Sequence, residues 1–170
     1  MLEPYGDWES RPVGDPRTAP RPQLMEALEE IVAAEGPLTA TRAFALANRA
    51  SGGRKLTNAV RTPLSSALGW LAQERRIVLV REDEIPWQED DVARAPGTPE
   101  VVVRELGTRE LIEVPLDEIA ELMRRLLAAG TAPAGDDEGL KRAVLAAYGL
   151  GRLTARADRH LATAIELLGD

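Results

Sequence analysis

The sequence predicts a mostly α-helical fold with a small antiparallel β wing, an α+β protein made of two related helical units of which the second lacks a wing. Apolar residues recur at helical spacing in two triplets of segments, one within residues 22–76 and one within residues 116–168. Between the triplets, the β-branched run at residues 77–80 is typical of a strand. The second triplet reaches almost to residue 170, which leaves no room for a second wing.

Composition narrows the possible chemistry. The 170 residues include no cysteine, and this excludes disulfides, thiolate zinc sites and cysteine nucleophiles. The sequence has a single histidine, His160. We expect His160 to be a surface residue, and we expect no cofactor and no metal. No apolar run approaches the ~20 residues that span a bilayer, and the polar start does not resemble a secretion signal. We therefore expect a cytoplasmic, non-catalytic protein without a membrane segment.

Residues 1–21 are predicted to form an extended, proline-rich arm, because frequent prolines prevent a regular helix or a central strand. Tyr5 and Trp8 are the only large aromatic residues in this arm. Two interpretations are open: the rings anchor the arm to a surface, or the arm is an unstructured tail.

Residues 22–114 are predicted to form the first unit. Amphipathic helices are expected over residues 22–34 and 40–50, where apolar residues recur every three or four positions. Gly36-Pro37 ends the first of these helices.

A third helix is expected to run from about Leu56 to Arg76 and to bury Trp70. Pro63 leaves two possibilities for its start. Either Thr62 caps the helix and Pro63 is its first residue, or the helix starts near Thr57 and is kinked at the proline.

The strand at residues 77–80 is followed by a strongly acidic loop, Glu82–Asp91, which contains Trp87. Glu100–Glu105 is predicted to be the return strand, and Leu111–Val114 a third short strand. Three helices followed by a hairpin with a long tip is the element order of a winged helix-turn-helix.

Residues 115–170 are predicted to form the second, wingless unit. Helices are expected over residues 116–129, 140–148 and 153–168, with Asp136 as the N-cap of the second of them.

The two units read as a diverged repeat. Leu56–Leu71 aligns with Leu153–Leu168 without a gap, and leucine, threonine and alanine coincide at five positions. The sequence therefore predicts tandem winged-helix-type units.

This element order resembles the winged-helix-like domain of unknown function found near the C-terminus of certain bacterial DNA helicases. The residues that carry the resemblance are Glu30–Ala47, Gly53–Val78 and Glu113–Ala128. The resemblance implies DNA transactions nearby, but it implies no defined activity and supplies no catalytic residue. The partners we expect are DNA and a helicase or nuclease. The chain differs from the helicases in having no motor motifs.

Charge is unevenly distributed along a chain whose formal net charge is −7. Residues 82–121 hold 13 acidic and 3 basic residues, whereas Gly36–Arg81 holds 8 basic residues and only one acid, Glu74. A recognition helix enters the major groove of DNA, where cations and amides contact phosphates and bases. The predicted DNA-binding residues are Arg42, Arg49, Arg54, Lys55, Asn58, Arg61, Arg75 and Arg76.

The leading functional hypothesis is a DNA-associated accessory or regulatory protein that binds through this basic third helix. The alternative is a protein–protein adaptor without direct DNA contact, in which the predicted partner-binding residues are Tyr5, Trp8 and Trp87. The acidic loop is interpreted as a solvated wing tip or as a cover over the basic helix. The sequence does not predict an oligomeric state.

Overall fold

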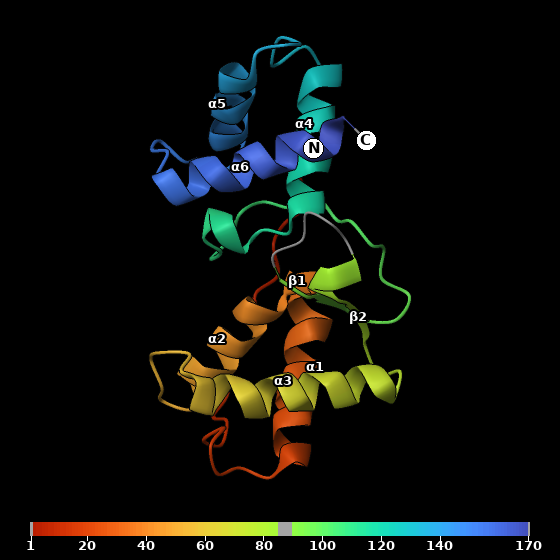
Figure 1. The fold of residues 1–170 in the computed structure, drawn as a ribbon, viewed down its shortest axis with the longest axis vertical. Helices are drawn as coiled ribbons and strands as arrows, with labels where there is room; N and C mark the ends of the chain where they lie inside the picture. The colour runs from red at the N-terminus through yellow and green to blue at the C-terminus, as the bar shows by residue number, and fades with distance from the viewer. Residues whose placement is uncertain (1, 85–89, 170) are drawn as a thin grey trace. The chain divides into compact units, whose positions relative to one another are not determined.

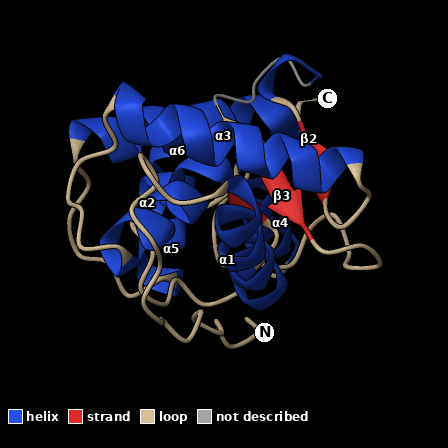
Figure 2. Ribbon diagram, turned by 90° about the horizontal axis from the view of Figure 1, so that it is seen from below, coloured by secondary structure: helices blue, strands red, loops and turns tan. Residues whose placement is uncertain are grey.

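The structure, a computed structural model, describes residues 2–84 and 90–169 (Figure 1). The chain divides into two compact units. The N-terminal unit is Gly6–Glu100, and the C-terminal unit combines Met1–Tyr5 with Val101–Asp170. Helices make up most of the described chain, and the strands form one small sheet (Figure 2).

These units differ from the predicted boundaries, which were 1–21, 22–114 and 115–170. Trp8 and Val13 of the arm pack into the core of the N-terminal unit. Val103 and Leu111, which were assigned to the first unit, pack into the core of the C-terminal unit. Burial of apolar side chains therefore moves the division to Glu100 and splits the arm after Tyr5.

The N-terminal unit has a helical layer beside a three-stranded sheet. Helix α1 packs against both α2 and α3. Leu28, Ile31, Leu64 and Leu68 fill the space between the helices, each at most 1% exposed. The elements are α1 (Arg21–Glu35), β1 (Leu38–Thr39), α2 (Ala40–Ala50), α3 (Asn58–Gln73), β2 (Val78–Val80), the 3-10 turn η1 (Glu82–Glu84) and β3 (Val92–Arg94). The first two helices and the strand after the third were predicted within one residue.

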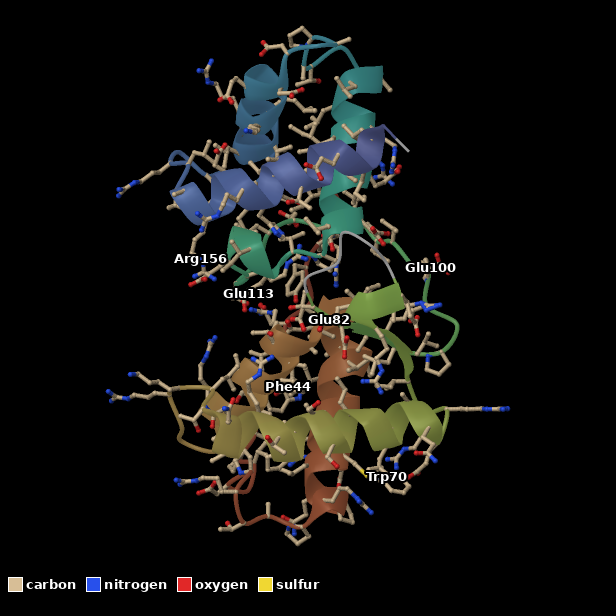
Figure 3. All side chains as sticks on the ribbon, viewed as in Figure 1. Phe44, Trp70, Glu82, Glu100, Glu113 and Arg156 are labelled. Carbon is tan, nitrogen blue, oxygen red and sulfur yellow. The ribbon has the colours of Figure 1, made fainter. Side chains whose placement is uncertain are left out.

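Helix α3 begins at Asn58, with Thr57 at the N-cap position, so the longer of the two predicted helices is the one that forms. Pro63 lies inside it and has no amide to donate to the carbonyl of Ala59. Ala59 is exposed, so water can satisfy that carbonyl. The prediction that Trp70 is a core residue was wrong, because the residue is 38% exposed. The Arg21 guanidinium lies 4.3 Å from its ring centroid, and Figure 3 labels Trp70 on α3.

The sheet is antiparallel with strand order β1-β3-β2. Ala93 of β3 lies opposite Leu38 on one side and Leu79 on the other, and it is fully buried. The short strand β1, directly before α2, was not predicted.

The predicted return strand Glu100–Glu105 was wrong, because β3 takes its place beside β2. The run instead contacts the start of the chain. The Glu3 amide donates to the Val103 carbonyl at 3.1 Å, and the Glu105 amide donates to the Glu3 carbonyl at 2.8 Å. Val103 is 3% exposed, so its apolar side chain serves the core of the C-terminal unit.

The strand predicted at Leu111–Val114 was also wrong. Leu111–Glu113 forms a 3-10 helix, η2, because a capping box closes it. The Glu110 amide donates to Glu113 Oε1 at 2.7 Å, and the Glu110 side chain accepts from the Glu113 amide.

The C-terminal unit is a three-helix arrangement in which α4 packs against α5 and α6. The helices are α4 (Leu116–Ala128), α5 (Asp137–Ala147) and α6 (Ala155–Leu168). The predicted cap Asp136 is confirmed, since its Oδ1 accepts from the Gly139 amide at 2.9 Å. Thr154 caps α6 in the same way through the Ala157 amide.

A buried ionic cluster ties the ends of this unit together. Glu118 on α4, 2% exposed, accepts hydrogen bonds at 2.9 Å from Arg104 and from Arg109. The Tyr5 ring lies 4.9 Å from the Arg104 guanidinium and 4.3 Å from that of Arg109. Residues from the arm, from the segment after Glu100 and from α4 therefore meet at one buried carboxylate.

Candidate nucleic-acid interface

The last turn of α2 and the turn that joins α2 to α3 present three cations to solvent. Asn48, 3% exposed, holds the turn: its Nδ2 donates to the Lys55 carbonyl at 3.1 Å, and its own carbonyl accepts from the Gly53 amide at 2.9 Å. A side chain at residue 53 would collide with that of Asn48, so the turn requires glycine. Arg49, Arg54 and Lys55 are exposed, and none has an ion-pair partner among the described residues.

The outward face of α3 continues this surface without any carboxylate. Exposed neutral polar side chains follow one another along the helix: Asn58, Thr62, Ser65, Ser66 and Gln73. The whole stretch Gly36–Gln73 contains no aspartate or glutamate. We name the cationic turn together with this face of α3 the α3 surface.

Arg42 does not contribute to that surface, which corrects the prediction. It is 2% exposed, and its Nε donates to Glu35 Oε1 at 2.8 Å. A guanidinium that is buried and paired in this way cannot reach a phosphate.

Arg61 faces α2 instead of projecting outward as predicted. Its guanidinium lies 5.6 Å from the Phe44 ring centroid, and its Nη2 lies 3.4 Å from Thr41 Oγ1 (Figure 3 labels Phe44). It also attracts the nearby Asp90 carboxylate electrostatically. Arg61 is therefore engaged within the unit and is not poised to read a base.

Arg75 and Arg76 follow the other end of α3, about 24 Å along a helix of 16 residues from its start. Arg76 pairs with Glu29 at 2.7 Å and with Glu74 at 3.4 Å, and the hydrogen bond to Glu29 raises the pKa of Arg76. Arg75 is exposed. The eight predicted residues thus separate: Arg49, Arg54, Lys55 and Asn58 come together, and the other four do not.

Arg81 is a cation near α3 that the sequence analysis missed. Its Nη2 lies 3.7 Å from the point that a β-carbon on Gly69 would occupy, so the guanidinium reaches the surface of α3. Its Nη1 lies 3.5 Å from Asp91 Oδ2, and the side chain is 47% exposed. The signal available in the sequence was its position directly after the predicted strand.

The two aromatic residues of the arm are used inside the chain. The Trp8 side chain is 8% exposed, and the Trp8 amide donates to Glu35 Oε2 at 2.9 Å. Tyr5 contacts Arg104 and Arg109 through its ring. Trp8 is therefore an anchor for the arm and cannot serve as the predicted partner contact, and Tyr5 is half-buried. Trp87 lies outside the described residues.

The described end of the acidic loop meets the start of α2. Asp90 Oδ2 accepts from the Thr41 amide at 2.9 Å, and the Asp91 carbonyl accepts from the Ala40 amide at 2.8 Å. Burial raises the pKa of Asp90, and the hydrogen bond from Thr41 opposes that rise. Asp90 therefore contacts the start of α2 through its side chain and Asp91 through its backbone, and among the described residues neither forms an ion pair with Arg54 or Lys55.

Within residues 2–84 and 90–169, no three aspartate, glutamate or histidine side chains gather closely enough to hold a metal ion. Over the same residues, every helix is too short or too polar to cross a bilayer.

His160 is half-buried, and its Nε2 lies 2.9 Å from the Val114 carbonyl.

Comparison with protein-family models, with curated proteins and with solved structures found no match to this chain.

Proposed function

We propose that the N-terminal unit is a winged-helix unit that binds duplex DNA without catalysing a reaction, in a protein with an accessory or regulatory role. The observation that carries the proposal is the α3 surface. Its three exposed cations have no ion-pair partner among the described residues, and they adjoin a helix face without carboxylates. A protein with a net charge of −7 would repel DNA over most of its surface, so contact would concentrate there.

The order of elements supports the winged-helix assignment. In helix-turn-helix proteins the second helix of the motif enters the major groove, and residues near its start contact base edges. In this chain α2 and α3 would be that motif, and β2 and β3 would flank the wing. The short strand β1 between α1 and α2 completes the sheet, as this assignment requires.

Each exposed residue then has a defined task. Arg49, Arg54 and Lys55 would contact phosphates, which fix position but carry no sequence information. Asn58, near the start of α3, has the amide that pairs with two groups of adenine. Arg81 would add a phosphate contact beside α3 once the DNA competes with Asp91 for its guanidinium.

The C-terminal unit would be the second member of a tandem pair, since α4, α5 and α6 repeat the helix order of α1, α2 and α3. It has no sheet of its own among the described residues. Its role in this proposal is to contact a protein partner such as a helicase or nuclease.

Salt dependence tests DNA binding directly. About four phosphate contacts give a slope near −3.6 in log affinity against log salt, roughly a 100-fold loss between 50 and 200 mM. Fluorescence anisotropy with a labelled duplex would measure the affinity. The triple variant Arg49→Ala, Arg54→Ala, Lys55→Ala should lower the slope to about −1.

The matched control removes three exposed cations from the C-terminal unit: Arg125→Ala, Arg142→Ala and Arg159→Ala. The two triple variants have the same net charge, so a loss confined to the first variant locates the contact on the α3 surface. Equal losses in both variants, or no binding by the natural protein at 50 mM salt, would reject the proposal.

A protein–protein adaptor is the second candidate. The observation in its favour is that Arg42, Arg61 and Arg76 are engaged within the chain, which leaves a small cationic surface on an anionic protein. An adaptor would bind its partner equally well after the Arg49, Arg54 and Lys55 substitutions. It would also fail to bind the labelled duplex, so the same titration separates the two functions.

A further inference from the structure

The C-terminal unit contains a cavity of about 600 Å³ between η2, the loop before α6 and the first turn of α6. This volume is within the ~300–1,000 Å³ that small-molecule sites occupy in proteins. Its lining combines apolar side chains with three arginines and one glutamate.

The lining is mostly apolar. Leu106, Leu111, Ile112 and Leu150 contribute branched side chains, and Leu111 is 7% exposed. Binding of an apolar group in the cavity would be favourable, because it removes these apolar side chains from contact with water.

Two arginines give the cavity a cationic side. Arg152 and Arg156 are exposed, and neither has an ion pair with any described residue (Figure 3 labels Arg156). Arg109 also lines the cavity, but Glu118 neutralises it from the buried side, with its Oε2 2.9 Å from Arg109 Nη2. The free positive charge therefore lies at Arg152 and Arg156.

Glu110 lines the cavity with a negative charge, and its position is fixed. Its side chain accepts a hydrogen bond from the Glu113 amide in the capping box of η2. A bound anion would be attracted to the two arginines and repelled by Glu110, which sets the direction in which the charged group must point.

We propose that this cavity binds a small amphipathic anion, with an aromatic or branched aliphatic body on the leucine and isoleucine side chains and one carboxylate, sulfonate or phosphate group between Arg152 and Arg156. Guanidinium groups suit such oxyanions because they donate two parallel hydrogen bonds. The site lies wholly within the C-terminal unit and does not depend on DNA binding by the N-terminal unit.

Two fluorescent probes that share one apolar body test the proposal on the full chain. 8-Anilinonaphthalene-1-sulfonate carries an anionic group, and N-phenyl-1-naphthylamine is the same ring system without it. The sulfonate should bind with one-to-one stoichiometry and at least about tenfold more tightly than the uncharged probe, which corresponds to one good charge-assisted contact.

Substitutions then locate the probe. Arg152→Ala with Arg156→Ala should weaken sulfonate binding about tenfold and leave the uncharged probe unchanged. Arg142→Ala with Arg159→Ala removes the same charge from exposed positions outside the cavity and should have no effect. Ala155→Trp, which fills the cavity from an exposed position, should abolish binding of both probes.

Glu110→Gln should raise the affinity for the sulfonate, and a one-to-one stoichiometry separates this gain from probe uptake by a partly unfolded chain. Its amide oxygen can still accept from the Glu113 amide, whereas the repelling charge is gone, so sulfonate binding should tighten by about two- to threefold. The proposal is overturned if both arginine pairs behave alike, if Ala155→Trp binds normally, or if the two probes bind equally well. Circular dichroism establishes that each variant is folded.

Discussion

Arg42 lies buried against Glu35, with Arg42 Nε 2.8 Å from Glu35 Oε1, and the second oxygen of that carboxylate accepts the Trp8 amide. The two side chains are 2% and 1% exposed. One ion pair therefore connects the end of α1, the start of α2 and the arm, and each charge depends on the other for its compensation.

Arg42→Met should destabilise the protein by about 3–5 kcal/mol, because it leaves a buried carboxylate without its cation. Urea unfolding measures the change. Arg11→Met, which breaks the exposed Arg11–Glu30 pair, is the control and should cost under ~1 kcal/mol. The double variant Glu35→Gln, Arg42→Met should recover part of the loss, since no uncompensated charge remains. A cost for Arg42→Met no larger than that of the control contradicts this account.

The arm should be held less tightly on α1 as the pH falls. Arg11 donates three hydrogen bonds to Glu30, from Nε at 2.9 and 3.1 Å and from Nη2 at 2.6 Å, and they hold the pKa of Glu30 below its ordinary value. A lowered carboxyl pKa stabilises the folded state above the ordinary pKa, and that contribution is lost as the pH falls through the lowered value.

Trp8 fluorescence reports this loosening in a Trp70→Phe, Trp87→Phe background. The emission maximum should begin to move to longer wavelength as the pH falls from the ordinary glutamate value of 4.5 through the lowered pKa of Glu30, because a larger share of molecules then exposes the ring. Arg11→Met should reduce the pH-dependent part of the change, since Glu30 then lacks its partner. An identical pH profile with and without Arg11 would show that another group controls the arm.

The end of α3 suggests a stabilising change. Arg75 has a φ of 61°, in the left-handed region that favours glycine, and it is the only non-glycine residue of the described chain with a positive φ. Its amide donates to the Ala72 carbonyl, and the Arg76 amide donates to the Leu71 carbonyl, which is the Schellman arrangement.

Arg75→Gly should therefore stabilise the protein by about 0.5–1 kcal/mol in urea unfolding. The substitution also removes one of the predicted DNA contacts. If the α3 surface is the interface, DNA affinity should change little, because Arg75 lies at the far end of the helix. Arg75→Ala keeps the left-handed strain and removes the same charge, so it should not stabilise.

The helices could be predicted because their apolar spacing and end signals are local. The Asp136 cap and the Gly36-Pro37 stop are read from a few adjacent residues. Strand β3 could not be found in this way, since Val92, Ala93 and Arg94 form no apolar run and pair only because Leu38 and Leu79 lie on either side. Glu100–Glu105 has the stronger local strand pattern, but its Val103 packs into the core of the C-terminal unit.

The environment of a predicted cation also depends on residues that are distant in the sequence. Arg42 was assigned to the surface because arginine is usually exposed. Glu35 continues the helical spacing of Leu28, Ile31 and Val32, so its carboxylate lies on the buried face of α1. A buried carboxylate requires a cation as its partner. That signal was in the sequence, but the identity of its partner depended on how α1 and α2 pack.

Asp90 should act as an external cap for α2. It accepts from the Thr41 amide in the first turn, next to Thr39, whose hydroxyl accepts from the Arg42 amide. Asp90→Ala should cost about 0.5–2 kcal/mol, the usual effect of losing a cap, and Asp90→Asn should cost less because its oxygen can still accept.

The difference in stability between the natural protein and Asp90→Asn should depend on pH, and this dependence is the sharper measurement. Burial raises the pKa of Asp90, so the folded state binds the proton more tightly than the unfolded state does. The stability of the natural protein relative to Asp90→Asn should therefore fall as the pH rises from below the ordinary aspartate value of 3.8 through the raised pKa. Urea unfolding of both proteins across that range supplies the comparison. A difference that grows with pH would mean that the ionised carboxylate stabilises the start of α2 more than its burial costs.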